Sequence, residues 1–324
     1  MSTTTRPTGR TTGVDLSVDL GGLVLPNPIM TASGCFASGR EIDALWNVSE
    51  LGAVVAKSVT LEPREGLPTP RMSETPSGML NAIGLQNPGV DAWLERDVPW
   101  LASRGARVVA SIAGNSVDDY REVARRVAAS RSVAAVEVNL SCPNVSHRGL
   151  VFACDPGRSA EVVRAVRQAL PDRPLFAKLT PDVTDIARIG RSVVEAGATG
   201  ISAINTTLGM AIDAETGRPK VANGFAGLSG PAIRPMAVRA VHQLFTELGP
   251  EVPIIGMGGV RTVTDVVEMV RAGASAVAIG TATFADPFTA ANLVRDLGPW
   301  LGRRGHTALA DLRGRIEPWP HHPR

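Results

Sequence analysis

Eight short apolar segments, each followed by an amphipathic helical pattern, predict an α/β fold of the (β/α)8 class, a TIM barrel. The length of 324 residues agrees with this prediction, since such barrels take about 250 residues and the excess falls in a hairpin and two long connections. Polar residues also gather at the C-terminal ends of the apolar segments, where these barrels carry their sites. Length alone would suggest about two domains, but one barrel accounts for the whole pattern.

The N-terminal elements come before the barrel. Residues 1–13 are polar, lack the apolar stretch of a secretory signal, and are expected to form a flexible tail. Residues 14–28 alternate apolar and polar side chains around Gly21 and Gly22, the pattern of a β-hairpin. A single barrel domain is expected over residues 14–305, and the Pro-rich residues 306–324 are expected to form an irregular C-terminal tail.

The repeating strand and helix units follow in order. The predicted strands are 28–33, 53–59, 107–114, 134–142, 175–181, 200–206, 253–259 and 276–282. The predicted helices are 41–52, 88–104, 117–130, 157–170, 184–197, 232–249, 262–273 and one after Asp286. Many of these helices begin after Ser, Thr or Asp and end at Gly, as capped helices do. Residues 60–87 and 207–231 remain as long loops after strands 2 and 6.

Composition excludes several function classes. With 44% apolar and 20% charged residues and a net charge of +2, the chain is typical of a soluble globular protein. No apolar run reaches the ~18 residues of a membrane span, and the charge gives no reason to expect nucleic acid or anionic lipid as a partner. The three cysteines, Cys35, Cys142 and Cys154, are scattered, so we expect no disulfide framework, no metal site and a reducing, cytoplasmic setting.

Lysine is rare in this chain, because only three of its 33 basic residues are lysines. Lys57 and Lys178 lie near the C-terminal ends of apolar strands, whereas Lys220 lies in a polar loop. A lysine inside a barrel is costly unless it meets an anion or a carbonyl group. Two interpretations follow: a Schiff-base nucleophile, or a cation beside a bound anion and an electron-accepting ring.

Two further strand ends carry candidate chemistry. Cys142 precedes a proline, which keeps its backbone extended, and its thiol could act as base or nucleophile if its pKa is lowered. Cys35 and Cys154 are interpreted as structural cysteines. The glycine-rich segment 256–259 and the pair Gly280-Thr281 follow strands 7 and 8, where barrels commonly bind phosphate.

Several long motifs resemble one known family, the class 1B dihydroorotate dehydrogenase catalytic subunits. The motifs are AKSVTLEP (56–63), PSGMLNAIGLQNPG (76–89), NLSCPN (139–144), INT (204–206), GLSGP (227–231), GMGG (256–259) and GT (280–281). The resemblance spans roughly residues 14–300 and implies an FMN-binding barrel with the flavin over the strand ends.

The resemblance also implies site residues. FMN would be lined by Ala32, Ser33, Lys57, Ser58, Ser111, Asn139, Lys178, Ile204, Gly230, Gly258, Gly259, Gly280 and Thr281. The substrate would contact Lys57, Asn81, Ala82, Ile83, Gly84, Leu85, Asn139, Asn144, Asn205 and Thr206. Cys142 matches the catalytic base of the family. Ser111 is a departure, because the family usually offers an Asn to the flavin at this position.

The implied reaction is the oxidation of (S)-dihydroorotate to orotate in de novo pyrimidine (UMP) biosynthesis. Cys142 would take the proton from C5 while the hydride leaves C6 for FMN, and Lys57 would stabilise charge on the reduced flavin. The chain carries no Rossmann fingerprint and no Fe–S cysteine set. The resemblance therefore implies a homodimer that pairs with a subunit holding FAD and a [2Fe–2S] cluster, a heterotetramer that relays electrons to NAD.

Three alternatives remain open on sequence alone. Residues 176–181 and 183–186 are similar to dihydropyrimidine dehydrogenases, which act on dihydrouracil. A flavin-free lyase could instead form a Schiff base on Lys57 or Lys178. A barrel without activity, serving as a binding scaffold, is the third.

Overall fold

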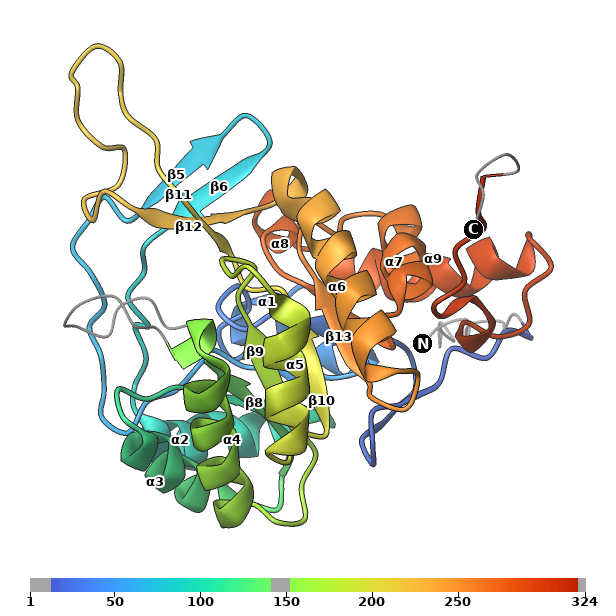
Figure 1. The fold of residues 1–324 in the computed structure, drawn as a ribbon, viewed down its shortest axis with the longest axis horizontal. Helices are drawn as coiled ribbons and strands as arrows, with labels where there is room; N and C mark the ends of the chain where they lie inside the picture. Colours follow the sequence, from blue (N-terminus) through green and yellow to red (C-terminus); the bar gives the residue numbers. More distant parts are fainter. Residues whose placement is uncertain (1–12, 141–151, 320–324) are drawn as a thin grey trace, which may run out of the picture.

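The structure, a computed structural model, describes residues 13–140 and 152–319, and its centre is an eight-stranded parallel sheet (Figure 1). The strands in chain order are β3 (Ile29–Thr31), β4 (Val54–Val55), β7 (Val108–Ile112), β8 (Val133–Asn139), β9 (Leu175–Leu179), β10 (Gly200–Ala203), β13 (Ile254–Met257) and β14 (Ala276–Ile279). Their hydrogen-bonded order is β3-β14-β13-β10-β9-β8-β7-β4, and a parallel bridge between Met30 and Ala53 joins the two end strands. The sheet is therefore closed, and the predicted barrel is confirmed.

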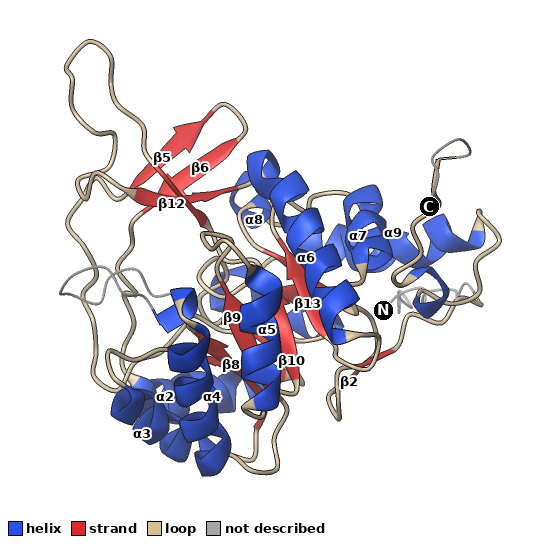
Figure 2. Cartoon of the chain, in the orientation of Figure 1, coloured by secondary structure: helices blue, strands red, loops and turns tan. Residues whose placement is uncertain are grey.

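Helices form the outer layer around this barrel (Figure 2). They are α2 (Val90–Ser103), α3 (Val117–Ala128), α4 (Pro156–Ala169), α5 (Ile186–Glu195), α6 (Arg234–Leu248), α7 (Val263–Ala272), the short α8 (Ala282–Ala285) and α9 (Thr289–Gly302). The side chains of Ser116, Asp155, Asp185 and Thr262 cap four of them by accepting a backbone N–H of the first turn. The capping signals in the sequence thus mark true helix starts.

The predicted helix over 41–52 is wrong in its extent. The structure has only α1 (Arg40–Asp43) and the 3-10 turn η1 (Val48–Glu50) there. Asn47 lies between them in an extended conformation, and its side chain accepts the N–H of Ser49 to begin the new turn. The indole of Trp46 donates to the carbonyl of Pro287, 2.9 Å away, so a tertiary contact fixes the break. Local helical pattern is overridden here by capping and tertiary packing.

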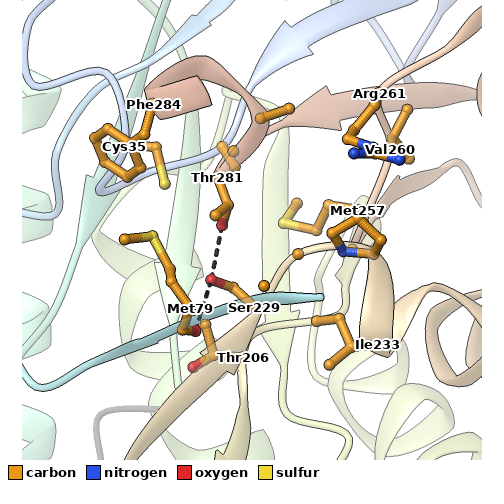
Figure 3. A pocket seen from close by; sticks show the side chains of 18 of the residues that line it. Cys35, Met79, Thr206, Ser229, Ile233, Met257, Val260, Arg261, Thr281 and Phe284 are labelled. Carbon is orange, nitrogen blue, oxygen red and sulfur yellow. Dashed lines mark hydrogen bonds between the residues drawn. The ribbon is translucent and has the colours of Figure 1, made fainter. Parts of the chain in front are cut away.

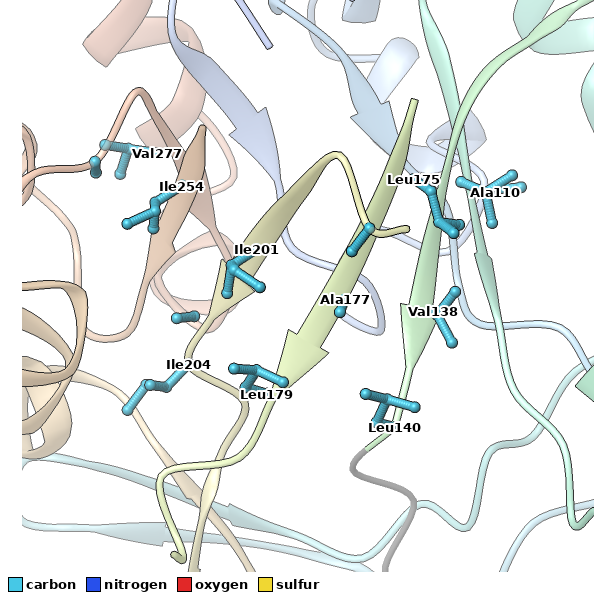
Figure 4. Close-up of a cluster of buried hydrophobic side chains, with 14 of the residues drawn as sticks. Ala110, Val138, Leu140, Leu175, Ala177, Leu179, Ile201, Ile204, Ile254 and Val277 are labelled. Atoms are coloured by element: carbon cyan, nitrogen blue, oxygen red, sulfur yellow. The ribbon is translucent and has the colours of Figure 1, made fainter. Parts of the chain in front are cut away.

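Side chains of the barrel strands alternate between two environments. On β9, Leu175, Ala177 and Leu179 point outward into the main hydrophobic cluster beneath the helices (Figure 4). Phe176 and Lys178, the residues between them, point into the barrel. Because of this period of two, the charged side chain of Lys178 points into the barrel although its strand is otherwise apolar.

The N-terminal hairpin closes one end of the barrel. It consists of β1 (Val18–Asp19) and β2 (Val24–Leu25), joined through Gly21 and Gly22, which adopt φ angles of 73° and 101°. Its leucines pack in one cluster with barrel-interior side chains such as Phe176 and Ile255. Gly21 and Gly22 face Thr199 and Pro174, which precede β10 and β9, so the hairpin covers the N-terminal ends of the strands.

The two long connections were expected as loops, but parts of them form a second sheet. The first contains β5 (Met72–Thr75) and β6 (Gly78–Asn81), and the second contains β11 (Thr207–Gly209) and β12 (Ala226–Ser229). They pair in the antiparallel order β11-β12-β6-β5 and stand together beyond one end of the barrel (Figure 1). The β6–β12 pairing joins residues more than a hundred positions apart, which no local pattern reveals.

The C-terminal segment 306–319 has little regular structure beyond the 3-10 turn η4 (Ala310–Leu312), yet it is fastened to the barrel domain. The backbone N–H of Leu309 donates to the carbonyl of Asp15 at 3.0 Å, and the N–H of Asp15 donates to the carbonyl of Thr307 at 2.8 Å. Arg313 donates to the carbonyl groups of Pro250, Val252 and Gly273. Residues 1–12 and 320–324 lie outside the described residues. Within the described ranges, no helix combines the length and apolar character that crossing a bilayer requires.

Candidate active site

A cavity of about 550 Å³ lies where the C-terminal ends of the barrel strands meet the second sheet (Figure 3). Many of the predicted site residues line it: Ala32, Ser33, Lys178, Ile204, Asn205, Thr206, Gly230, Gly258, Gly259, Gly280 and Thr281. The tip of the β5–β6 hairpin, residues 74–79, forms a further wall. Segments scattered over the whole sequence therefore converge on one hollow of ligand size.

Glycine is required at the end of β13. Gly258 and Gly259 adopt φ angles of 131° and 70°. A Cβ on Gly258 would lie 2.7 Å from the Cβ of Ala237, and one on Gly259 would lie 2.7 Å from the carbonyl oxygen of Gly230. The backbone therefore passes bare along the cavity, which is the arrangement that lets backbone groups approach an anion.

A chain of hydroxyl contacts ties the barrel to the second sheet (Figure 3). Thr281, just after β14, donates to the hydroxyl of Ser229 on β12 at 2.7 Å. Ser229 in turn donates to the carbonyl of Met79 on β6 at 3.4 Å. These bonds hold the wall of the cavity against the end of the barrel.

Lys178 is the buried cation of the cavity. Lys178 is only 3% exposed, and its Nζ donates to the hydroxyl of Ser33 at 3.0 Å. The same Nζ lies 3.6 Å from Oε1 of Glu137. Burial of an ammonium is tolerated because a carboxylate and a hydroxyl group compensate it.

Glu137 is among the residues at the site that the sequence analysis did not name, as is the cavity-lining Ser229. Glu137 lies on β8 and is 1% exposed. The available signal was its position as the one charged residue in the otherwise apolar run VAAVEV, residues 133–138. The period of two along the strand turns Glu137 inward with Ala135 and Asn139, while Val136 and Val138 face the helices.

Ser58, Ser111 and Asn139 are linked to Glu137 by a continuous hydrogen-bond network. Ser111 donates to Oε1 of Glu137 at 3.1 Å, and the hydroxyl groups of Ser111 and Ser58 lie 2.8 Å apart. Asn139 donates to Ser58 at 3.2 Å and accepts from Nδ2 of Asn205 at 3.4 Å. The network thus runs from the carboxylate beside Lys178 to Asn205 on the cavity wall.

Several of the predicted substrate residues do not line the cavity. Lys57 is partly buried, and its Nζ would lie 3.6 Å from a Cβ added to Gly34. Asn81, at the end of β6, donates to the carbonyl of Gly227 at 3.3 Å. Ala82, Ile83, Gly84 and Leu85 follow it and, like Lys57 and Asn81, are not among the residues that line the cavity. Cys142 and Asn144 lie outside the described residues.

The two described cysteines differ in their surroundings. Cys35 lines the cavity, and burial raises the pKa of its thiol, although Lys178 and Lys57 act in the opposite direction. Cys154 is exposed. No group of three or more His, Cys, Asp or Glu side chains within the described ranges is arranged as metal ligands would be.

Comparison with known proteins agrees with this geometry. The family model for dihydroorotate dehydrogenase matches residues 15–301. The catalytic subunit of dihydroorotate dehydrogenase B (NAD(+)) from Anoxybacillus flavithermus is 49% identical over 300 residues, which cover 93% of this chain and 95% of that protein. The subunit of the same name from Listeria monocytogenes is 48% identical over 298 residues, 92% of this chain and 97% of that protein.

A solved structure has the same fold as this chain. The crystal structure of DHODH from Eimeria tenella in complex with ferulenol matches with a TM-score of 0.80 and 25% sequence identity, covering 93% of this chain and 88% of that one. Fold and sequence therefore agree with these proteins over nearly the whole chain. The chain belongs to the dihydroorotate dehydrogenase family, as a relative of its B-type (class 1B) catalytic subunits.

Proposed function

We propose that this chain binds FMN in the cavity and oxidises (S)-dihydroorotate to orotate, a step of pyrimidine synthesis. The observation that carries the proposal is the cavity itself, which joins a bare glycine backbone at one side to the buried ammonium of Lys178. Its volume of about 550 Å³ falls within the ~300–1,000 Å³ usual for ligand sites. The names of the relatives, all dihydroorotate dehydrogenases, support the choice of substrate.

The residues of the cavity suit the parts of FMN. The backbone at Gly230, Gly258, Gly259, Gly280 and Thr281 would hold the phosphate, since glycine and small residues leave N–H groups open to an anion. Ala32, Ser33, Lys178 and Ile204 would contact the remainder of the cofactor, with Lys57, Ser58, Ser111 and Asn139 beside them. When bound, FMN supplies an acceptor for the hydride that leaves C6 of the substrate.

Substrate recognition would use the amide groups at the other end of the hydrogen-bond network. Asn139 and Asn205 are fixed to each other at 3.4 Å, and Asn205 also accepts the backbone N–H of Thr206 at 2.8 Å. Amides held in this way can pair with the imide and carboxylate of a planar ring. Asn81, Asn144 and the segment 82–85 would complete the substrate site, with Lys57 as a cation for the developing charge.

Cys142 is proposed as the base. Oxidation of dihydroorotate removes a proton from C5 and a hydride from C6, so a proton acceptor must face C5. Cys142 would take that proton, and its place in the motif shared with the family supports the assignment. Cys142 lies outside the described residues, so the proposal rests on sequence.

The electrons must then leave the chain, and we propose that they pass to a partner subunit that carries FAD and a [2Fe–2S] cluster and reduces NAD. The relatives are named catalytic subunits of an NAD(+) enzyme, which supports a separate electron-transfer partner. We further propose a homodimer of this chain within a heterotetramer, in the cytoplasm.

The interpretation of Lys178 or Lys57 as a Schiff-base nucleophile in a flavin-free lyase receives no support from family membership. The geometry also disfavours it for Lys178, because its Nζ is engaged by the hydroxyl of Ser33 at 3.0 Å and lies 3.6 Å from a carboxylate oxygen of Glu137. Dihydrouracil remains useful as a control substrate for the related flavin barrels.

The decisive experiment is an absorbance spectrum of the purified chain, followed by anaerobic addition of dihydroorotate. We expect a bound-flavin spectrum that bleaches with dihydroorotate and not with dihydrouracil. NAD alone should not restore the oxidised spectrum, because the partner is missing. A chain that binds no FMN after reconstitution, or flavin that bleaches only with dihydrouracil, would overturn the proposal.

A further inference from the structure

A buried acidic side chain directly beside the cavity has no role in the proposed function. Glu137 is 1% exposed and lies on β8, between Ser111 of β7 and Lys178 of β9. The strand register pairs Ser111 with Glu137, and Asn139 with Lys178, so these four side chains occupy neighbouring inward positions. Barrel interiors are usually filled by apolar branched side chains, which makes this polar group exceptional.

The contacts of Glu137 are specific. One carboxylate oxygen, Oε1, lies 3.6 Å from Nζ of Lys178 and accepts the hydroxyl of Ser111 at 3.1 Å. Nζ of Lys178 also donates at 3.0 Å to the hydroxyl of Ser33, which lines the cavity. The ammonium is thus held between an acidic group inside the barrel and a hydroxyl group on the cavity wall.

Stability gives no reason for this arrangement. Removing two charges from water is costly, and apolar side chains of similar volume often stabilise a core at least as well as a buried ion pair. The pair does, however, fix the position of the ammonium at the cavity and reduce its net positive field. The position of the ammonium and its reduced positive field both act on the ligand that the cavity binds.

We propose that Glu137 is a positioning residue that holds the ammonium of Lys178 at the cavity and offsets part of its charge, thereby setting the reduction potential of the bound flavin. This inference rests on the proposed function, since it needs FMN in the cavity. Reduction adds electrons to the flavin, so a positive neighbour favours the reduced form and a negative one opposes it. Glu137 therefore keeps the potential lower than Lys178 alone would set it.

The test is the potential of FMN on the full chain, measured by equilibrium with reference dyes of known potential. For Glu137→Gln, which keeps the shape but removes the charge, we expect the potential to become more positive. A tenfold change in the ratio of affinities for reduced and oxidised FMN corresponds to about 30 mV for a two-electron couple. We expect a shift of at least about this size.

Two further variants separate charge from packing. Glu137→Asp keeps the charge and should shift the potential less than Glu137→Gln does. In the double variant Glu137→Gln with Lys178→Gln, both charges are gone, and the potential should fall below that of Glu137→Gln alone.

The matched control is Asp97→Asn on α2. Asp97 is also buried, at 6% exposed, and pairs with Arg40 and Arg96 on the outer surface of the barrel. Its substitution removes an equivalent charge away from the cavity and should leave the potential unchanged. Equal shifts for Glu137→Asp and Glu137→Gln, or an unchanged potential in Glu137→Gln, would overturn the inference while FMN remains bound. Failure of the unmodified chain to bind FMN would instead overturn the proposed function.

Discussion

The hydroxyl groups of Ser58 and Ser111 lie 2.8 Å apart inside the barrel and connect its two polar regions. On one side Ser111 donates to Glu137, and on the other side Ser58 accepts from Asn139. Both serines are almost fully buried. Ser111, which the resemblance predicts to line FMN, is therefore already engaged in the protein's own hydrogen-bond network.

The first prediction concerns this network. Ser111→Ala removes the donor to Glu137 and the partner of Ser58, and leaves their polar atoms buried. Unsatisfied buried groups of this kind cost about 1–3 kcal/mol, so the free energy of unfolding should fall by about that amount. Chemical denaturation of the purified chain measures it.

Ser202→Ala is the matched control. Ser202 on β10 is fully buried and pairs in register with Lys178, but its hydroxyl has no hydrogen-bond partner among the described residues. Its loss should change the free energy of unfolding little. Equal destabilisation by the two variants would show that cavity formation, and not the hydrogen bonds, accounts for the effect at Ser111.

The fold could be predicted from the sequence to the extent that its signals are local. Alternating strands and capped helices identified all eight barrel strands, since each unit carries its own period and its own capping residue, as Thr262 does for α7. The second sheet was not predictable in this way. Its strands are only three or four residues long, and the two hairpins β5–β6 and β11–β12 join through the pairing of β6 with β12. That pairing is a tertiary contact, which local patterns do not carry.

The site was predictable in part for a similar reason. Gly258, Gly259 and Lys178 stand out because a glycine pair and a buried lysine are unusual at strand ends. Glu137 stood out less, although the same rule applies: a charge within an apolar strand needs a partner of opposite sign. The partner, Lys178, lies 41 positions further along, on the next strand, and only the barrel brings the two within 3.6 Å.

The second prediction concerns the glycine backbone of the cavity. Gly259→Ala places a Cβ 2.7 Å from the carbonyl oxygen of Gly230 and 2.9 Å from Arg234, at a φ of 70°. The backbone must move, so we expect FMN affinity to fall by about tenfold or more, together with a loss of about 1 kcal/mol or more in stability. Fluorescence titration of the flavin-free chain with FMN measures the affinity.

Gly249→Ala controls for backbone strain alone. Gly249 ends α6 with a φ of 78°, and a Cβ there meets nothing within 4 Å. This variant should lose stability but bind FMN as the unmodified chain does. Unchanged FMN affinity in Gly259→Ala would argue against a phosphate site at this turn.

The third prediction tests the proposed base. In Cys142→Ser the hydroxyl group has a far higher pKa than a thiol, so proton removal from C5 slows, and turnover at neutral pH should fall by about a hundredfold or more. FMN should remain bound, as its absorbance spectrum will report. Cys154→Ser, at an exposed position, is the control and should keep full turnover. Normal turnover in Cys142→Ser would remove Cys142 from the mechanism.

The last prediction uses the thiol of Cys35 as a reporter of the cavity. Burial raises the pKa of Cys35, so at neutral pH a smaller fraction is thiolate than in an ordinary cysteine. Alkylation of Cys35 should therefore be slow at pH 7, and its rate should rise with pH over a higher range than that of an ordinary thiol, which is half ionised at about pH 8.5. Because Cys35 lines the cavity, added FMN should slow its alkylation further, as peptide mass spectrometry can measure. Cys154 is the internal control, since FMN should not alter its rate. Equal rates at Cys35 with and without saturating FMN would mean that the flavin does not cover this wall of the cavity.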